Sequence, residues 1–257
     1  MLRITVFAPK NLFFKGKFSL GIICLLFLSF LAIIFSITLG PYDISNREIL
    51  SYFLNSLGLD SQSITITQIA ILETVRLPRI LMAFVIGGGL SVSGVIMQGV
   101  FRNNLADPGI IGISAGGATG AVLAIFTGMA VLSVWIVPIF AFVGSFVSLL
   151  FVFTISTLSG RISVPTLILS GIAIGAFLNS ITSAIIIFSG DIESQRQMIF
   201  WLAGGFDSAR WISLKIVVPM ILIPTTLAII FSRDLNLLML GEDQGNSLGI
   251  RVQFSRN

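Results

Sequence analysis

Long stretches without a charged residue constrain this chain more than any other feature. The run from Phe18 to Leu39 contains none, and neither do residues 110–160. Roughly 20 apolar residues are enough for a helix to cross the hydrocarbon core of a bilayer. With 55% hydrophobic and 10% charged residues, the chain lacks the surface of a soluble domain, in which about 25% of residues are charged. The sequence therefore predicts an all-α, polytopic membrane protein.

The apolar runs divide into six predicted transmembrane helices. Residues 110–160 are longer than the ~20 residues that one span requires at a helical rise of about 1.5 Å per residue, so they accommodate two. The predicted spans are Phe18–Leu39, Ile80–Gln98, two within residues 110–160 that separate near Thr127, Gly128 and Ser133, Thr166–Phe188 and Trp211–Phe231. The polar connections at residues 41–79 and 189–210 are then expected outside, and residues 232–257 inside.

Basic residues near the N-terminus set the expected orientation. Arg3, Lys10, Lys15 and Lys17 precede the first span, and cytoplasmic segments are enriched in Lys and Arg, so we expect a cytoplasmic N-terminus. A cleaved signal peptide is the competing interpretation, but the apolar run is long for one and ends at Leu39 without a small-residue cleavage motif. The formal net charge of +4 then reflects topology, and we expect no nucleic-acid partner.

The side-chain inventory argues against redox, metal and acid–base chemistry. The chain has one cysteine, Cys24, and no histidine, so an intrachain disulfide is excluded and a transition-metal site is disfavoured. The charged residue within the predicted spans is Lys215, near an outer end. Ion-coupled transporters usually carry such residues deep in the membrane, although sites built from carbonyls and hydroxyls keep a secondary transporter open. We expect no enzymatic activity, no cofactor and no bound metal.

Glycines inside the spans point to close packing of helices. Glycine recurs every fourth residue from Gly112 to Gly120 and from Gly171 to Gly175, which lets backbones approach where lipid provides no hydrophobic drive for association. Gly87–Gly89 lie in an apolar run and lack the Gly-Lys-Ser/Thr of a phosphate-binding loop. They too are interpreted as packing residues, and no ATP site is expected in this chain.

Three stretches of the sequence resemble one family of transport proteins. They are RLPRILMAFVIGGGLSVSGVIMQGVFRNNLADPGIIGISAGGATGAVLAI at residues 76–125, LILSGIAIGAFLNSITSAIIIFSGDIESQRQMIFWLAGGFDSARW at 167–211 and RDLNLLMLGEDQGNSLGIRV at 233–252. In this order they are similar to the FecCD-type permeases of ABC importers. The resemblance implies import of a ferric siderophore, haem or cobalamin with a binding protein and an ATPase.

The resemblance also implies a larger fold than these residues can form. Family members typically have ten spans, and this chain would correspond to the N-terminal part, ending just after a loop that contacts the ATPase. We expect residues 1–257 to form a single transmembrane permease domain, C-terminally incomplete, with a cytoplasmic coupling loop at 232–257. A fragment, an interrupted gene and a second chain are all open explanations. A smaller departure is Asn104, where the family usually has the proline of Asn-Pro-Leu-Ala.

Two contacts with partner proteins are implied by the resemblance. Arg76 is expected to pair with a carboxylate of the docked binding protein, and an ion pair with Glu73, one helical turn earlier, is the alternative. The expected ATPase-coupling residues are Gly241, Glu242, Ser247, Leu248 and Gly249. A solvated tail is the alternative interpretation of that segment.

The substrate path is inferred from the resemblance in the same way. Ser163, Val164 and Pro165 are expected at an inner gate, and the outer segment Asp191–Asp207 at an outer one. Asn179 and Ser183, on the fifth predicted span, are expected to contact the substrate weakly along the path.

Together these inferences predict a multi-pass permease subunit of the bacterial cytoplasmic membrane, importing a ferric siderophore. Its expected partners are a dimer of ABC ATPase subunits, an extracytoplasmic substrate-binding protein, a second permease subunit that is identical or different, and the lipid bilayer. Cobalamin or haem is the alternative cargo. An ion-coupled secondary transporter and an inactive truncated product are the alternative functions.

Overall fold

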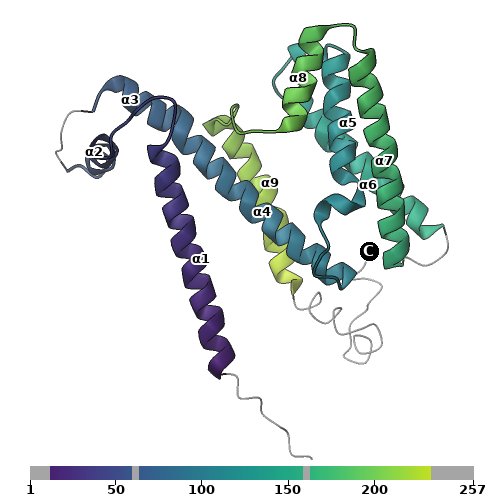
Figure 1. The fold of residues 1–257 in the computed structure, drawn as a ribbon, viewed down its shortest axis with the longest axis horizontal. Coiled ribbons are helices and arrows are strands. Elements are labelled where there is room, and N and C mark those ends of the chain that lie inside the picture. The colour runs from purple at the N-terminus through teal and green to yellow at the C-terminus, as the bar shows by residue number, and fades with distance from the viewer. Residues whose placement is uncertain (1–11, 60–63, 159–162, 233–257) are drawn as a thin grey trace, which may run out of the picture. The chain divides into compact units, whose positions relative to one another are not determined.

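The computed structural model describes residues 12–59, 64–158 and 163–232, and the regular elements among them are helical (Figure 1). The α-helices are α1 Leu12–Thr38, α2 Asn46–Ser56, α3 Ile66–Ile71, α4 Leu77–Phe101, α5 Ile113–Phe126, α6 Ile136–Thr157, α7 Val164–Phe188, α8 Ile192–Ala203 and α9 Trp211–Ile230. A π-helical turn, Leu72–Arg76, joins α3 to α4. Two 3-10 turns, Pro108–Ile111 and Met129–Val131, flank α5.

Five described stretches are long and apolar enough to cross a membrane. They are Ser19–Thr38, Ile66–Phe101, Ile136–Thr157, Val164–Phe188 and Trp211–Ile230. They match five of the six predicted spans, so the prediction of an all-α polytopic membrane protein is confirmed.

The second of these stretches begins earlier than predicted, at Ile66 rather than near Ile80, because α3, the π turn and α4 are continuous. Thr65 starts it with a capping box: the Thr65 hydroxyl accepts from the Gln68 backbone N–H, and the Gln68 side chain accepts from the Thr65 N–H. This reciprocal pair satisfies two backbone donors at the start of the helix. The residues before Ile80 are therefore helical, although the sequence predicts a polar connection there.

The first of the two spans predicted within residues 110–160 falls on α5, which is shorter than a full span. Its 14 residues cover ~21 Å at a rise of ~1.5 Å per residue, less than the ~30 Å hydrocarbon core. Gly112 and Gly128 flank it in the left-handed backbone conformation, with φ of 75° and 72°. A residue in that conformation interrupts a right-handed helix, and glycine adopts it without steric cost. The break after α5 thus lies at Gly128, within the predicted interruption.

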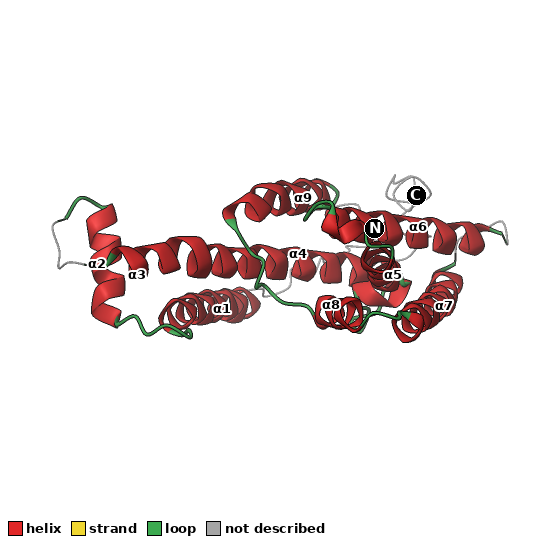
Figure 2. Ribbon diagram, turned by 90° about the horizontal axis from the view of Figure 1, so that it is seen from above, coloured by secondary structure: helices red, strands yellow, loops and turns green. Residues whose placement is uncertain are grey.

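Contacts within the chain group it into two units, residues 1–84 with 209–215 and residues 85–208 with 216–257. In the first unit, the C-terminal end of α1 packs with α2 and the π turn around Ile37, Ile44, Ile49 and Leu72. Comparison of Figures 1 and 2 shows that α2 runs crosswise to α1.

In the second unit, α5 contacts α6, α7 and α8, and it is the buried helix of the group (Figure 1). Gly116 and Gly120 allow the close contact with α6. A Cβ atom on Gly116 would collide with the backbone oxygen of Gly144, and one on Gly120 with that of Phe140. The glycine repeat therefore brings two backbones together, as the sequence pattern predicts.

Hydroxyl groups join the same helices inside the second unit. The bonds join Thr119 Oγ1 to Thr182 Oγ1 at 2.9 Å (α5 to α7), Ser148 Oγ to the Gly112 carbonyl oxygen at 2.9 Å (α6 to the start of α5) and Ser156 Oγ to Ser170 Oγ at 2.8 Å (α6 to α7). Such interhelical bonds contribute about 1 kcal/mol each in a membrane. They fix the helices against one another without any charged group.

The three consecutive glycines of α4, Gly87–Gly89, differ in how closely they are packed, although the sequence predicts a packing role for all three. A Cβ atom on Gly89 would lie 2.8 Å from Ile221 Cγ2 of α9, whereas one on Gly87 or Gly88 would have no neighbour within 4 Å. Packing among the described residues therefore explains the last glycine of the triplet and leaves the first two without an explanation.

We predict that Gly120→Ala destabilises the detergent-solubilised protein. The new methyl group would force α5 away from the Phe140 backbone, and overpacking of this kind costs about 1–3 kcal/mol. The measurement is the thermal unfolding midpoint. Gly94→Ala is the matched control, because a Cβ atom there has no neighbour within 4 Å and alanine is the better helix former. Equal midpoints for the two variants would contradict the close α5–α6 contact.

Candidate functional site

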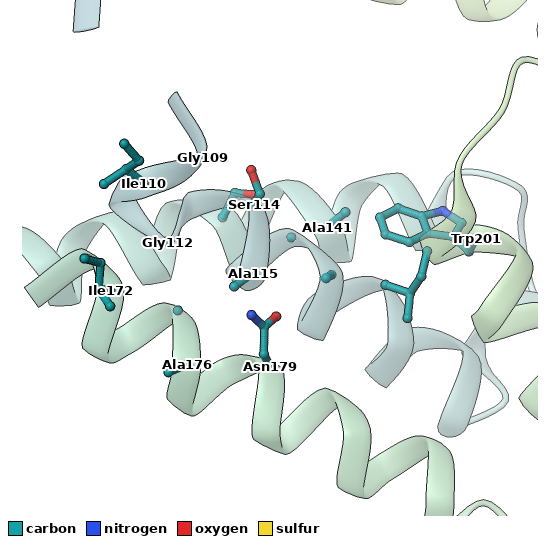
Figure 3. A pocket seen from close by; sticks show the side chains of 16 residues that line it. Gly109, Ile110, Gly112, Ser114, Ala115, Ala141, Ile172, Ala176, Asn179 and Trp201 are labelled. Carbon is teal, nitrogen blue, oxygen red and sulfur yellow. The ribbon is translucent and has the colours of Figure 1, made fainter. Parts of the chain in front are cut away.

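A cavity of about 760 Å³ lies in the second unit among α5, α6, α7, α8 and the 3-10 turn before α5 (Figure 3). It is lined by Gly109, Ile110, Gly112, Ser114, Ala115, Gly117, Ala118, Ala141, Ser145, Gly171, Ile172, Gly175, Ala176, Asn179, Trp201 and Leu202. None of these side chains is charged. The volume is in the range of roughly 300–1,000 Å³ that ligand pockets occupy.

Small residues shape one wall of this cavity. The Asp107 carboxylate accepts from the Gly109 N–H at 2.7 Å and caps the 3-10 turn, which begins with Pro108. The turn then meets the backbone of α7: a Cβ atom on Gly112 would lie 2.7 Å from the Gly171 oxygen, and one on Gly171 would lie 2.7 Å from the Ile110 oxygen. Backbone therefore packs against backbone here, and glycine is required on both sides of the contact.

The polar groups of the cavity are neutral. Asn179 projects from α7 toward the space beside Ala115, and the Trp201 ring lies at the other end (Figure 3). Ser114 and Ser145 contribute hydroxyls. An amide both donates and accepts hydrogen bonds, a hydroxyl does the same, and an indole N–H donates. The lining can thus form weak polar contacts with a ligand, but it offers no counter-charge.

Of the two residues predicted along the substrate path, the structure brings one to the cavity. Asn179 lines it, whereas Ser183, four residues further along α7, is exposed and lies outside the lining. Sequence reasoning missed the contributions of Ala141 and Ser145 from α6. The one sequence feature that marks Ala141 and Ser145 is their small size. Small residues occur both where helices pack closely and in the wall of a cavity, so size alone does not distinguish the two.

The predicted gate residues form the start of α7. Ser163 is the N-cap: its hydroxyl accepts from the Thr166 N–H at 3.2 Å and lies 2.6 Å from the Thr166 hydroxyl. Val164 and Pro165 are in the first turn, where proline is tolerated because its missing N–H has no helical partner. Gating by these residues stays a prediction, on the same helix that lines the cavity.

Arg76 ends the π turn and lies buried in the first unit, with 7% of its surface exposed. Its guanidinium donates to the carbonyl oxygens of Ile37, Thr38 and Tyr42, at the C-terminal end of α1 and just beyond it. A Cβ atom on Gly40 would lie 2.7 Å from Arg76 Nη2, so glycine makes room for the side chain. Docking by Arg76 stays a prediction, and it would require the guanidinium to leave these carbonyls.

Glu73, the alternative partner of Arg76, bonds elsewhere. Its carboxylate accepts from the Tyr52 hydroxyl of α2 at 3.0 Å, and its backbone oxygen accepts from the Trp211 indole at 2.7 Å. The π turn is therefore tied to α2 and to the first residue of α9, both within the first unit. Burial and the Glu73 carboxylate raise the pKa of the Tyr52 phenol, so that hydroxyl stays protonated and can donate.

Asp191 determines where α8 begins and so helps to place Trp201 at the cavity. Its carboxylate accepts from the Ser194 hydroxyl at 2.6 Å and from the Ser194 N–H at 2.9 Å. These bonds to Ser194, the hydroxyl first, lower the pKa of the Asp191 carboxyl. The predicted outer segment Asp191–Asp207 thus contains a capped helix rather than only a loop.

Two further expectations concern the ATPase-coupling residues and metal binding. The coupling residues Gly241, Glu242, Ser247, Leu248 and Gly249 lie outside them. Within residues 12–59, 64–158 and 163–232, no three His, Cys, Asp or Glu residues gather where they could hold a metal ion.

Comparisons with known proteins find similarity to transport permeases. A family model described as the FecCD transport family matches residues 25–257. A cobalamin import system permease protein of Halobacterium salinarum is 36% identical over 186 residues, which are 72% of this chain and 49% of that protein. A hemin transport system permease protein of Yersinia pestis is 37% identical over 185 residues, which are 71% of this chain and 55% of that protein.

A comparison with solved structures also finds similarity to a transport protein. A solved structure described as a metal-chelate type ABC transporter in an inward-facing conformation superposes with a TM-score of 0.76 at 31% identity, covering 94% of this chain and 70% of that one. The chain spans about half the length of the first two curated relatives.

We predict that Arg76→Gln destabilises the first unit. The glutamine cannot reach all three carbonyls, and hydrogen bonds to a charged group contribute about 1.5–3 kcal/mol. Thermal unfolding of the purified protein in detergent gives the measurement, with Arg47→Gln as the control, since Arg47 is exposed on α2. A midpoint for Arg76→Gln equal to that of the control would show that the carbonyl contacts contribute nothing.

We also predict that the effect of Asp191→Ala depends on pH. The folded pKa of this carboxyl is lowered, so its stabilising effect is complete above the unfolded value of ~3.9 and is lost as pH falls through the folded value. At pH 7 the variant should unfold at a lower temperature than the parent, and the difference should shrink as the pH falls below ~3.9. A pH-independent difference would argue against a role for the ionised carboxylate.

Proposed function

This chain belongs to the FecCD transport family, and from that premise we propose that it acts as a permease subunit of a binding-protein-dependent ABC importer in the cytoplasmic membrane. Its proposed cargo is a ferric siderophore. Cobalamin or haem is the second candidate, which the names of the two relatives favour. The observation that carries the proposal is the uncharged cavity beside Asn179, lined in part by the candidate membrane spans α6 and α7.

The lining of the cavity suits transit of a large chelate better than capture of a bare ion. A transition-metal ion is best held by imidazole, thiolate or carboxylate groups, and the lining contains none of these side chains. A chelate carries its own ligands and presents amide, hydroxyl or ring surfaces instead. Weak polar contacts from Asn179, Ser114 and Ser145 let such a cargo enter and also let it leave, which transport requires.

The same proposal assigns partners to this chain. A separate ATPase dimer supplies the energy and contacts residues 241–249. A binding protein delivers the chelate at the outer face, with Arg76 as the proposed docking residue. A second permease subunit completes the path, and Ser163, Val164 and Pro165 gate its inner end. The permease itself catalyses no reaction in this scheme.

Uptake by the native complex tests the proposal. The chain is affinity-purified from its own membranes with whatever subunits accompany it and reconstituted into vesicles. Uptake of a ferric siderophore, cyanocobalamin or haem is then compared with ATP inside or outside, and with a sodium or proton gradient alone. An accompanying ATPase and ATP-dependent uptake support the importer. Gradient-driven uptake without ATP would support an ion-coupled transporter, and no uptake under either condition would support an inactive product.

Within this assay we predict that Asn179→Ala slows uptake several-fold. The change removes the amide that projects into the cavity, while the complex and its ATPase content should stay unchanged. Ser180→Ala is the matched control on the neighbouring residue, because the Ser180 hydroxyl donates to the Ala176 carbonyl oxygen of its own helix and lies outside the lining. Equal uptake rates for both variants would exclude Asn179 from the path.

A further inference from the structure

Helix α2 lies at the end of a membrane-crossing helix and runs across it. The candidate span of α1 ends at Thr38, and α2 begins eight residues later at Asn46. In Figure 1 α2 is seen almost end-on while α1 is seen lengthwise, and in Figure 2 α2 is seen lengthwise. Because α1 crosses the bilayer, a helix crosswise to it at its end lies along the bilayer surface.

One side of α2 is held by the rest of the first unit. Ile49 is buried in the core with Ile37 and Leu72. The Glu48 carboxylate accepts from the Gln68 amide at 2.7 Å, and the Tyr52 hydroxyl donates to Glu73 at 3.0 Å. These contacts fix the rotation of α2 about its own axis.

The other side of α2 is apolar and bare. Leu50, Phe53 and Leu57, the C-cap residue just after the end of α2, are 58%, 40% and 75% exposed. Their spacing of three and four residues places them on one side of the helix and its cap. The end of α1 is bare and apolar as well, with Phe35 and Leu39 65% and 66% exposed. Exposure of this apolar stripe to water would be unfavourable, whereas the neighbouring helix α1 is already surrounded by lipid.

We propose that α2 is an interfacial helix whose stripe of Leu50, Phe53 and Leu57 inserts into the lipid leaflet at the C-terminal end of α1. An amphipathic helix with its apolar side in the acyl boundary and polar residues above it is stable in that position. Arg47 and Asn55 are exposed on the same helix and supply the polar part. Insertion of this stripe requires neither the cargo nor the partner subunits.

The consequence is that the depth of α2 in the leaflet positions the start of the next span. Its contacts with Gln68 and Glu73 connect the stripe to α3 and the π turn. The same π turn ends with Arg76, which holds the end of α1. Lipid thickness on this side of the membrane therefore acts on α1 and on the π turn together.

Nitroxide spin labels test the depth of the stripe in a chain that contains all of residues 1–257. Cys24 is the single cysteine, so Cys24→Ala provides a cysteine-free background for Leu57→Cys and Phe53→Cys. Asn55→Cys is the control, because Asn55 is two residues from each of them and so lies on another side of the helix. The labelled chain is reconstituted in phosphatidylcholine vesicles, and the accessibility of each label to oxygen, which dissolves in lipid, and to a water-soluble nickel chelate is measured. The oxygen-to-nickel ratio should be several times higher at Leu57 and Phe53 than at Asn55.

Two results would overturn the proposal. A low ratio at Leu57 and Phe53 would place the stripe in water. Low accessibility to both reagents, with immobile labels, would show that another protein surface covers it. A second measurement uses the unsubstituted chain: a phosphatidylcholine with a photoreactive acyl chain should crosslink to residues 50–57 as well as to α1. Crosslinks on α1 without any on α2 would also overturn the proposal.

Discussion

Backbone-to-backbone contact around α5 is the constraint on which the second unit depends. A membrane gives helices no hydrophobic reason to associate, because lipid tails are as apolar as the side chains. Association then rests on dispersion at close range, which is small for each atom pair and large in sum. Gly116 and Gly120 expose the α5 backbone to α6, and Gly112 does the same toward Gly171 of α7. Larger side chains at these positions would separate the helices and remove most of those contacts.

Small side chains on these helices also produce the cavity. Where Gly112 and Gly171 meet, the backbones touch, and beside that contact the small residues Ala115, Gly175 and Ala176 line the cavity. The hydroxyl pair of Thr119 and Thr182 joins α5 to α7, two of the helices that line the cavity. The side chains that line the cavity are thus neutral, and neutral hydroxyl groups join its helices.

The sequence predicts the helical fold well because an apolar run in lipid has little choice other than a helix. It also predicts glycine packing, since a four-residue repeat leaves one face bare. It fails where the outcome depends on backbone geometry. The short length of α5 follows from left-handed Gly112 and Gly128, and the early start of the second span follows from the Thr65 cap. Asn179 lines the cavity and Ser183 does not, a difference that depends on tertiary packing, which helical periodicity does not encode. A role of either residue on a substrate path stays a prediction.

The π turn explains why Arg76 and Glu73 do not behave as an ordinary helical pair. In an α-helix, residues three apart share a face, and the two side chains would meet. The wider π turn, closed by hydrogen bonds five residues apart, rotates them onto different faces, so Glu73 bonds to Tyr52 of α2 while Arg76 turns to α1. The last carbonyls of a helix have no partners of their own and carry partial negative charge, which makes them a good site for a guanidinium. A docking partner that drew Arg76 outward would have to break this contact, so docking and the geometry at the end of α1 would be coupled.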